Sequence, residues 1–239
     1  MIRRRFIDER QILARLDHPH IARLLDAGST RDGQPYLALE YVEGEAITTW
    51  CRQQGASLEA RLRLFLQTCD AVSHAHANLI VHRDLKPSNI LVTTGEEVRL
   101  LDFGIAKLLD GVERMEGGSG TLQRTGTGVR AFTLHYAAPE QLRSEPVTTM
   151  TDVYALGVVL YELLTGAPPY RVKDGSDAEW ERAILGTEPV RPSQAAQATL
   201  DEEGRDSGLP RNLPRALRGD LDNLVRRALA KDPEKRYPS

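Results

Sequence analysis

Apolar residues near the start of the chain recur at helical spacing. Phe6, Leu13 and Leu16 fall on one face if residues 5–16 form a helix. That helix is expected to end before His18-Pro19, because the residue before a proline avoids the helical region of backbone space. The pattern therefore predicts a short amphipathic helix at the beginning of the chain.

Two short apolar runs follow this helix. Residues 21–27 and 36–41 lack helical spacing and are separated by the turn-forming triplet Arg31-Asp32-Gly33. Their lengths and the turn between them predict a β-hairpin.

A longer amphipathic helix is predicted over residues 58–78. Five apolar residues are expected to form its buried face: Leu62, Phe65, Leu66, Cys69 and Val72. Beyond this helix, residues 90–92 and 98–101 predict two short strands around the turn at residues 94–96.

The second half of the chain alternates between clear and weak patterns. Residues 151–165 are apolar on nearly all sides and predict a buried helix, and residues 221–229 predict a final amphipathic helix. Residues 110–130 are rich in glycine, threonine, serine and arginine and predict a loop outside the core. Residues 186–212 show little periodicity and predict an irregular surface connection.

Composition places the chain among globular proteins. Of its 239 residues, 41% are hydrophobic and 27% charged, and the net charge of −3 argues against nucleic acid or a membrane surface as partner. The two cysteines, Cys51 and Cys69, have no metal-ligand spacing, so a reducing cytoplasmic location is expected. The longest apolar run, Val153 to Leu164, is too short to span a membrane, and an anchor beyond residue 239 is left open.

Three polar residues within six positions suggest catalysis. Asp84, Lys86 and Asn89 lie on a loop that Pro87 stiffens, so a carboxylate, an ammonium and an amide can face one point. Phosphoryl transfer uses such groups to orient a hydroxyl, offset phosphate charge and hold a metal ion. Asp102 follows a predicted strand and adds a second hard oxygen, which with Asn89 suits Mg²⁺. The alternative is that Asp84 and Asn89 only cap local turns.

The spacing of three motifs resembles the protein kinase superfamily. These motifs are His82-Arg83-Asp84-Leu85-Lys86-Pro87-Ser88-Asn89, Asp102-Phe103-Gly104 and Ala138-Pro139-Glu140. The chain is most similar to bacterial, eukaryotic-like (Hanks-type) Ser/Thr kinases. The resemblance implies an α+β kinase fold, with a mainly helical large lobe over residues 42–239. It also implies a partial, β-containing small lobe over residues 1–41, with one helix and two strands.

The resemblance also implies roles for individual residues. Asp84 would be the catalytic base, Lys86 would contact the transferred phosphate, and Asn89 and Asp102 would bind Mg²⁺. The substrates would be ATP and protein Ser/Thr hydroxyls.

Four further residues would contact the adenine of ATP. By resemblance, Glu40 and Val42 would bind it through their backbones, with Leu39 as gatekeeper and Leu91 beneath the ring. An ordinary edge strand would have a similar sequence.

Regulation is expected to involve five residues. Glu9 shares the apolar face of the first helix, where a carboxylate needs a cationic partner; in kinases this is a lysine on an earlier strand. Exposure at the edge of that face is the alternative. Arg83 is expected to meet a phosphorylated loop residue, with Thr125 and Thr127 as the favoured acceptors. The alternative is that these threonines belong to a solvated linker and that Arg83 bonds a backbone carbonyl. Thr133 is expected to contact Asp84 and Lys86.

Other residues resemble structural elements of kinases. His82 would stack in an apolar column with Phe103, Leu13 and Leu24. Glu140 would pair with Arg236. Asp152 would accept hydrogen bonds from the backbone of the catalytic loop, or cap its own helix.

The sequence departs from the family at both ends. No glycine-rich phosphate loop precedes residue 5, no strand lysine is present to meet Glu9, and a closing helix is missing after Ser239. The chain is therefore expected to be a fragment truncated at both ends, with little activity alone. A non-catalytic pseudokinase-like interaction module is the main alternative, and a small-molecule phosphotransferase is a third.

Overall fold

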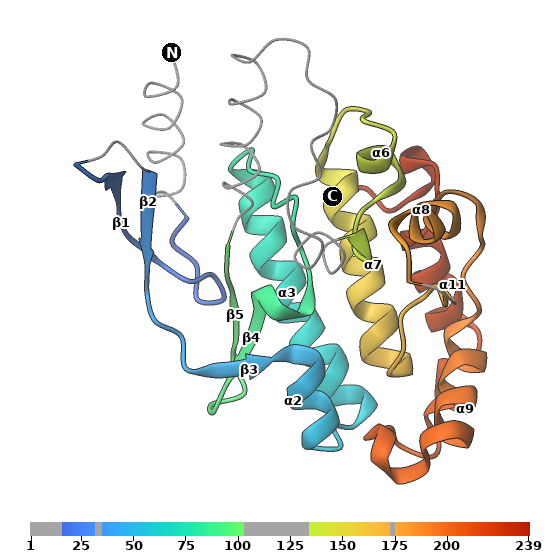
Figure 1. Ribbon diagram of the computed structural model, residues 1–239. Coiled ribbons are helices and arrows are strands. Elements are labelled where there is room, and N and C mark those ends of the chain that lie inside the picture. Colours follow the sequence, from blue (N-terminus) through green and yellow to red (C-terminus); the bar gives the residue numbers. More distant parts are fainter. Residues whose placement is uncertain (1–15, 32–34, 103–133, 173–174) are drawn as a thin grey trace.

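The computed structural model describes residues 16–31, 35–102, 134–172 and 175–239. A two-stranded hairpin lies at one edge, a three-stranded sheet lies beside it, and helices form the rest of the molecule (Figure 1). The expected α+β architecture is confirmed. The helix predicted over residues 5–16 and the loop predicted over residues 110–130 lie outside the described residues.

The predicted hairpin is present. Strand β1 (Leu24–Ser29) pairs antiparallel with β2 (Pro35–Leu39), with Leu24 opposite Leu39. β1 begins later than residue 21 because the preceding residues pair elsewhere. Ile21 forms a parallel bridge with Leu100, and the Ala22 amide donates to the Leu100 carbonyl over 2.9 Å.

The second sheet contains both strands predicted in the middle of the chain. Its order is β3 (Gly44–Ala46), β4 (Ile90–Thr93), β5 (Val98–Leu100), and all pairs are antiparallel. β3 was not predicted, because three residues are too few to establish a period. β4 begins directly after Asn89 and β5 ends two residues before Asp102, so this sheet positions both residues.

The predicted long helix is α3 (Leu58–Ala77), preceded by the shorter α2 (Ile47–Gln53). The assignment of its buried face was partly wrong, because the side chain of Leu66 is 66% exposed. The buried residues of α3 include two polar ones, Arg61 and Thr68, and two small ones, Ala71 and Ala75, beside Leu64 and Val72. A pattern search weighted toward large apolar residues misses such a face.

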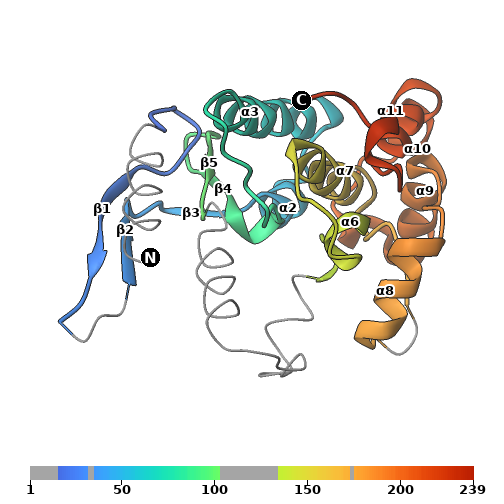
Figure 2. The same ribbon diagram turned by 90° about the horizontal axis from the view of Figure 1, so that it is seen from above.

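Helix α7 (Thr149–Thr165) is buried as predicted. It lies beside α3 and separates two apolar cores, one shared with the sheet and α3 and the other with the C-terminal helices (Figure 2). Gly157 permits close packing, because a Cβ atom there would lie 2.9 Å from the Cβ of Ala228. Because α7 packs against one apolar core on each side, it is apolar nearly all round.

The prediction of an irregular connection over residues 186–212 was wrong. The region contains α9 (Pro192–Glu203) and the 3₁₀ turn η2 (Gly204–Ser207). α9 begins with a proline, which suits the first turn of a helix, and buries Ala195 and Ala196. Because their side chains are small, these alanines do not produce a recognisable apolar period in the sequence.

The remaining elements are η1 (Pro87–Asn89), α6 (Pro139–Leu142), α8 (Asp177–Gly186), α10 (Leu213–Leu217), α11 (Asp220–Ala228) and η3 (Pro233–Lys235). Of these, α11 and η3 pack against α7. α11 matches the predicted final amphipathic helix. Within the described residues, no helix has the length and apolar character needed to cross a bilayer.

Replacing Leu79 with glycine is expected to stabilise the fold. Leu79 follows α3 with a φ of 62°, and the bonds Leu79 N–H to His76 carbonyl and Ile80 N–H to Ala75 carbonyl form a Schellman motif. Glycine is favoured at this left-handed position, and the leucine side chain is 93% exposed, so little packing is lost. Urea melts should show a gain of about 0.5–1 kcal/mol. Leu79→Ala keeps the backbone strain, and an equal gain there would contradict this explanation.

Candidate active site

The loop after α3 is held by a buried carboxylate on α7. Asp152 accepts hydrogen bonds from the backbone amides of His82 (2.7 Å) and Arg83 (2.9 Å). Nε2 of His76 lies 2.8 Å from the same side chain. The predicted contact between Asp152 and the catalytic loop is confirmed, whereas Thr148 caps the helix.

His82 connects this loop to the end of β5. The Asp84 amide donates to its Nδ1 (3.3 Å), so its Nε2 carries the proton and donates to the Leu101 carbonyl (2.9 Å). Burial lowers the pKa of His82, which keeps the ring neutral. Both ring nitrogens are engaged with the backbone, and the residue therefore has a structural role.

The three polar residues of the loop converge as the sequence predicts. Lys86 Nζ donates to Asp84 Oδ2 over 2.8 Å, and Asn89 Nδ2 donates to the Asp84 backbone carbonyl over 2.9 Å. The Asp84 and Lys86 side chains remain 16% and 23% exposed. The carboxylate is thus oriented by two neighbours and still reachable by an incoming hydroxyl.

Asp102 comes directly after Leu101, whose backbone is hydrogen-bonded to that of Asn89. The Leu101 amide donates to the Asn89 backbone carbonyl over 2.8 Å, and Asp102 is exposed with a φ of 45°. Because Asn89 Nδ2 is bound to Asp84, its amide oxygen is the atom that could face a cation. One amide and one carboxylate oxygen suit Mg²⁺ that also binds phosphate and water.

The described residues contain no cluster of three or more His, Cys, Asp or Glu side chains suited to a metal ion.

Arg83 is positioned by its backbone. Its φ is 67°, and its carbonyl accepts a hydrogen bond of 3.3 Å from Gln141 on α6. The two bonds made by its amide and carbonyl connect the candidate catalytic loop to both α7 and α6.

Two of the predicted adenine-binding residues, Leu39 and Leu91, lie on separate sheets, and Glu40 and Val42 lie in the segment between β2 and β3. Leu39 ends β2, and the Glu40 amide donates to the Arg23 carbonyl over 2.9 Å. Val42 is half-buried between the sheets, and Leu91 is half-buried on β4.

Several predicted residues are not placed by the structure. Glu9, Leu13, Phe103, Thr125, Thr127 and Thr133 all lie outside the described residues. Leu24, the remaining member of the proposed apolar column, is half-buried on β1.

The predicted ion pair between Glu140 and Arg236 is confirmed. Both guanidinium nitrogens bind the carboxylate, Nη1 to Oε1 at 2.7 Å and Nη2 to Oε2 at 2.8 Å, and both residues are 2% exposed. The Thr151 hydroxyl donates to Glu140 as well. This pair joins α6 to the last residues of the chain.

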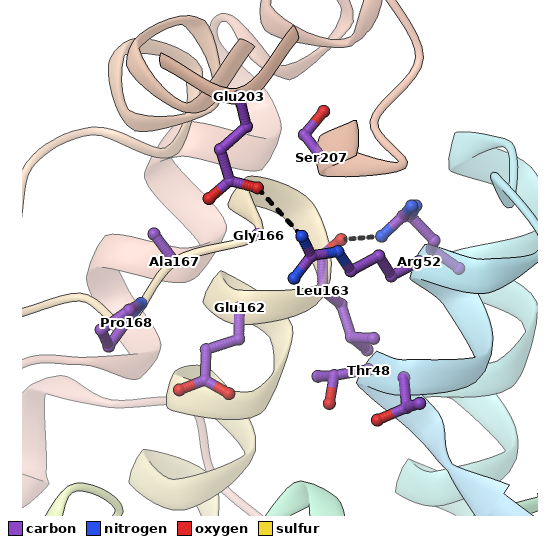
Figure 3. A pocket seen from close by; sticks show the side chains of 11 residues that line it. Thr48, Arg52, Glu162, Leu163, Gly166, Ala167, Pro168, Glu203 and Ser207 are labelled. Carbon is purple, nitrogen blue, oxygen red and sulfur yellow. Dashed lines mark hydrogen bonds and ion pairs between the residues drawn. The ribbon is translucent and has the colours of Figure 1, made fainter. Parts of the chain in front are cut away.

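Sequence reasoning gave no role to Glu162, the one acidic residue in the apolar run from Val153 to Leu164. It borders a cavity of about 280 Å³ between α2, α7 and α9, opposite Glu203 (Figure 3). Tyr136 donates to its carboxylate at 2.9 Å. Burial raises the pKa of Glu162 to about 7. A lone acid within the apolar run from Val153 to Leu164 was the available signal.

Glu162→Gln is expected to change the pH dependence of stability. Because the folded-state pKa is raised above the ordinary 4.5, the contribution of Glu162 is fully present below pH 4.5 and lost as pH rises through 7. The variant can keep the Tyr136 contact and should be more stable than the parent at pH 8 by about 1–3 kcal/mol. Melts between pH 4.5 and 8 test this, with Glu203→Gln as control. Equal pH slopes for the parent and Glu162→Gln would contradict it.

Comparison with known proteins gives a consistent result. Residues 1–238 match the family described as "Protein kinase domain". The chain is 33% identical over 237 residues to the serine/threonine-protein kinase PknB of Mycobacterium tuberculosis, covering 98% of this chain and 33% of that protein. It is 34% identical over 235 residues to PrkC of Bacillus subtilis, covering 98% and 32%. The chain spans about a third of the length of these relatives.

Proposed function

The chain belongs to the protein kinase domain family, and on that premise we propose that it catalyses transfer of the ATP γ-phosphoryl group to serine or threonine hydroxyls of proteins. Residues 1–41 would belong to the small lobe and residues 42–239 to the large lobe. The proposal rests on one observation above all: the convergence of Lys86 and Asn89 on Asp84, in a loop held by Asp152.

Asp84 would act on the acceptor. Its carboxylate is fixed by Lys86 Nζ at 2.8 Å and is partly exposed, so it can accept the proton of a serine or threonine hydroxyl and orient the oxygen. The neutral His82 ring has both nitrogens bound to backbone groups, so we assign it no part in proton transfer.

Lys86 and the two oxygen ligands would act on the phosphate. The Lys86 ammonium lies beside the carboxylate and can offset charge on the transferred phosphoryl group. Asn89 and Asp102 would hold Mg²⁺, which when bound neutralises the phosphate oxygens. The Leu101 amide donates to the Asn89 carbonyl over 2.8 Å, and this bond keeps the backbone next to Asp102 close to that of Asn89.

The assignment of the adenine-binding residues remains part of the proposal. The Glu40 carbonyl and the Val42 amide would meet the adenine edge, with Leu39 and Leu91 near the ring. The Glu40 amide is already bound to Arg23, which agrees with a role for its carbonyl rather than its amide.

The regulatory residues also remain proposals. Glu9 would pair with a lysine, and Arg83 would bind a phosphate on Thr125 or Thr127. Thr133 would contact Asp84 and Lys86. Arg83 has a left-handed backbone, and its amide and carbonyl are hydrogen-bonded to Asp152 and Gln141. These bonds fix the point from which its side chain leaves the backbone.

The test is a transfer assay with the full gene product that contains residues 1–239. Incubation with Mg²⁺, ATP and a generic protein substrate such as myelin basic protein should add phosphate groups, measured as intact-mass increments. Removing Mg²⁺ with EDTA should stop the reaction. Nucleotide binding without any transfer would instead indicate a pseudokinase-like interaction module.

A further inference from the structure

Gln141 connects the candidate catalytic loop to the segment before α6 through one side chain. Its Nε2 donates to the Arg83 backbone carbonyl over 3.3 Å, and its Oε1 accepts a hydrogen bond of 2.9 Å from the Ala138 amide. A donor faces the amide oxygen and an acceptor faces the amide nitrogen, so both bonds form in a single orientation of the side chain. A group with only one of these two functions could not make both bonds.

The Arg83 carbonyl belongs to the peptide unit that leads into Asp84. The amide of the same unit donates to His82 Nδ1 over 3.3 Å, so this unit is held at both of its polar atoms. Arg83 has a φ of 67°, which is strained for a residue with a side chain and persists where the surroundings hold it. Asp152 holds the Arg83 amide, and Gln141 holds the Arg83 carbonyl. Gln141 therefore helps to set the direction in which the Asp84 side chain leaves the backbone.

The segment before α6 is fixed on its other side as well. Tyr136 donates to Glu162 on α7 at 2.9 Å. The His135 ring stacks on Trp180 of α8, with the ring centres 3.8 Å apart. Gln141 therefore joins the loop that carries the proposed catalytic base to a segment that is anchored on two helices.

Helix capping alone does not explain Gln141. The bond from the Ala138 amide to Oε1 is the reach-back bond of a capping box, made by the residue at the third position of α6. That role uses only the oxygen of the side chain. The nitrogen bonds a carbonyl 58 positions earlier in the chain. A glutamate could cap α6 in the same way, whereas donation to the Arg83 carbonyl requires the amide nitrogen.

We propose that Gln141 is a positioning residue for phosphate transfer, which fixes the peptide unit before Asp84 through its bond to the Arg83 carbonyl. This inference rests on the proposed function. Gln141 acts through the backbone and contacts no reacting atom. Without its bond, the charges of Asp84 and Lys86 stay the same, but the direction of the Asp84 carboxylate is less well defined. Loss of the bond is therefore expected to lower kcat and to leave nucleotide binding unchanged.

The substitution Gln141→Glu separates positioning from capping. The carboxylate can still accept from the Ala138 amide, but it cannot donate to the Arg83 carbonyl. The kcat of the full gene product should fall about tenfold, and the KM for ATP should change by less than about twofold. Between pH 7.5 and 5.5 the introduced carboxyl group increasingly takes up a proton and regains a donor. The ratio of variant to parent kcat should therefore rise as the pH falls.

Two further variants control for charge and for substitution in general. Gln141→Met has a similar shape, no charge and neither hydrogen bond, so it should lose kcat to a similar extent and should not recover at low pH. Gln194→Glu makes the same chemical change at an exposed position on α9 and should keep the parent kcat.

Hydrogen exchange gives a readout that needs no catalysis. The Asp84 amide lies in the peptide unit that Gln141 holds, so it should exchange about two- to tenfold faster in both Gln141 variants, as expected for loss of one hydrogen bond. The amides of His82 and Arg83 donate to Asp152 and should exchange at the parent rate. Mass spectrometry with electron-transfer fragmentation resolves the exchange of single residues.

The proposal is overturned if the Asp84 amide exchanges at the parent rate in both Gln141 variants, or if Gln141→Glu retains the kcat of an active parent. A parent that transfers no phosphate would refute the proposed function instead. The exchange rates alone would then decide whether Gln141 fixes the peptide unit before Asp84.

Discussion

Replacing Asp84 with asparagine is expected to lower kcat for phosphate transfer by about 10²- to 10⁴-fold in the full gene product. Asparagine has nearly the same shape, so the contacts from Lys86 and Asn89 can persist in part. It cannot accept the hydroxyl proton, which is the role given to this carboxylate. The KM for ATP should change little, because Asp84 is not proposed to hold the nucleotide.

The control for this experiment is Asp201→Asn. Asp201 is exposed on α9, where it accepts a hydrogen bond from Gln197 one turn earlier. This variant should keep the parent rate. Steady-state kinetics with a generic protein substrate would measure both variants. A loss of less than threefold in Asp84→Asn would remove the carboxylate from its assigned role.

Truncating either partner of the ion pair between Glu140 and Arg236 is expected to lower the free energy of unfolding by about 3–5 kcal/mol. Each residue is 2% exposed, so the remaining partner would keep an uncompensated charge in the core. Arg236 also donates to the backbone carbonyls of Ala230 and Met150, which fixes its planar head. Lysine cannot reproduce this geometry, so Arg236→Lys should also be destabilising.

A double-mutant cycle is the control for this pair. Removing both side chains leaves no unpaired charge, so the double alanine variant should lose less stability than the sum of the two single variants. Urea unfolding curves would measure all three. If the stability lost in the double variant equals the sum of the two single losses, the two residues act independently. That result would contradict an interaction through the 2.7 and 2.8 Å contacts.

The ion pair between Glu140 and Arg236 should also affect how the free energy of unfolding changes at acid pH. Burial opposes ionisation of Glu140, but the hydrogen bonds from Arg236 outweigh it and lower the pKa of the carboxyl group. A depressed folded-state pKa gives stability that is present above the unfolded value of 4.5 and lost as pH falls through the folded value. Glu140→Gln should therefore flatten the curve below pH 4.5.

The elements predicted best are those with many large apolar side chains, whether on one face or nearly all round. α7 and α11 were clear for this reason, and the hairpin was marked by its turn. α9 was missed because it packs through Ala195 and Ala196, whose small side chains do not mark a period. The error at Leu66 has the same origin, since a large residue was preferred over the smaller ones that are buried.

The candidate site was predictable in part because its residues are close in sequence. Asp84, Lys86 and Asn89 lie on one short loop, and local spacing is enough to suggest that they meet. Family resemblance supplied the long-range partners Asp152 and Arg236. The contact of Tyr136 with Glu162 joins segments 26 positions apart, and spacing alone does not reveal it.

The identity of the phosphorylated amino acid tests the central claim most directly. The full gene product would be incubated with Mg²⁺, ATP labelled at the γ-phosphate and a mixed protein substrate, and the labelled protein would be hydrolysed. We expect phosphoserine and phosphothreonine, both falling to background in the Asp84→Asn variant. Label in phosphotyrosine or a small molecule alone, or undiminished label in the variant, would contradict it.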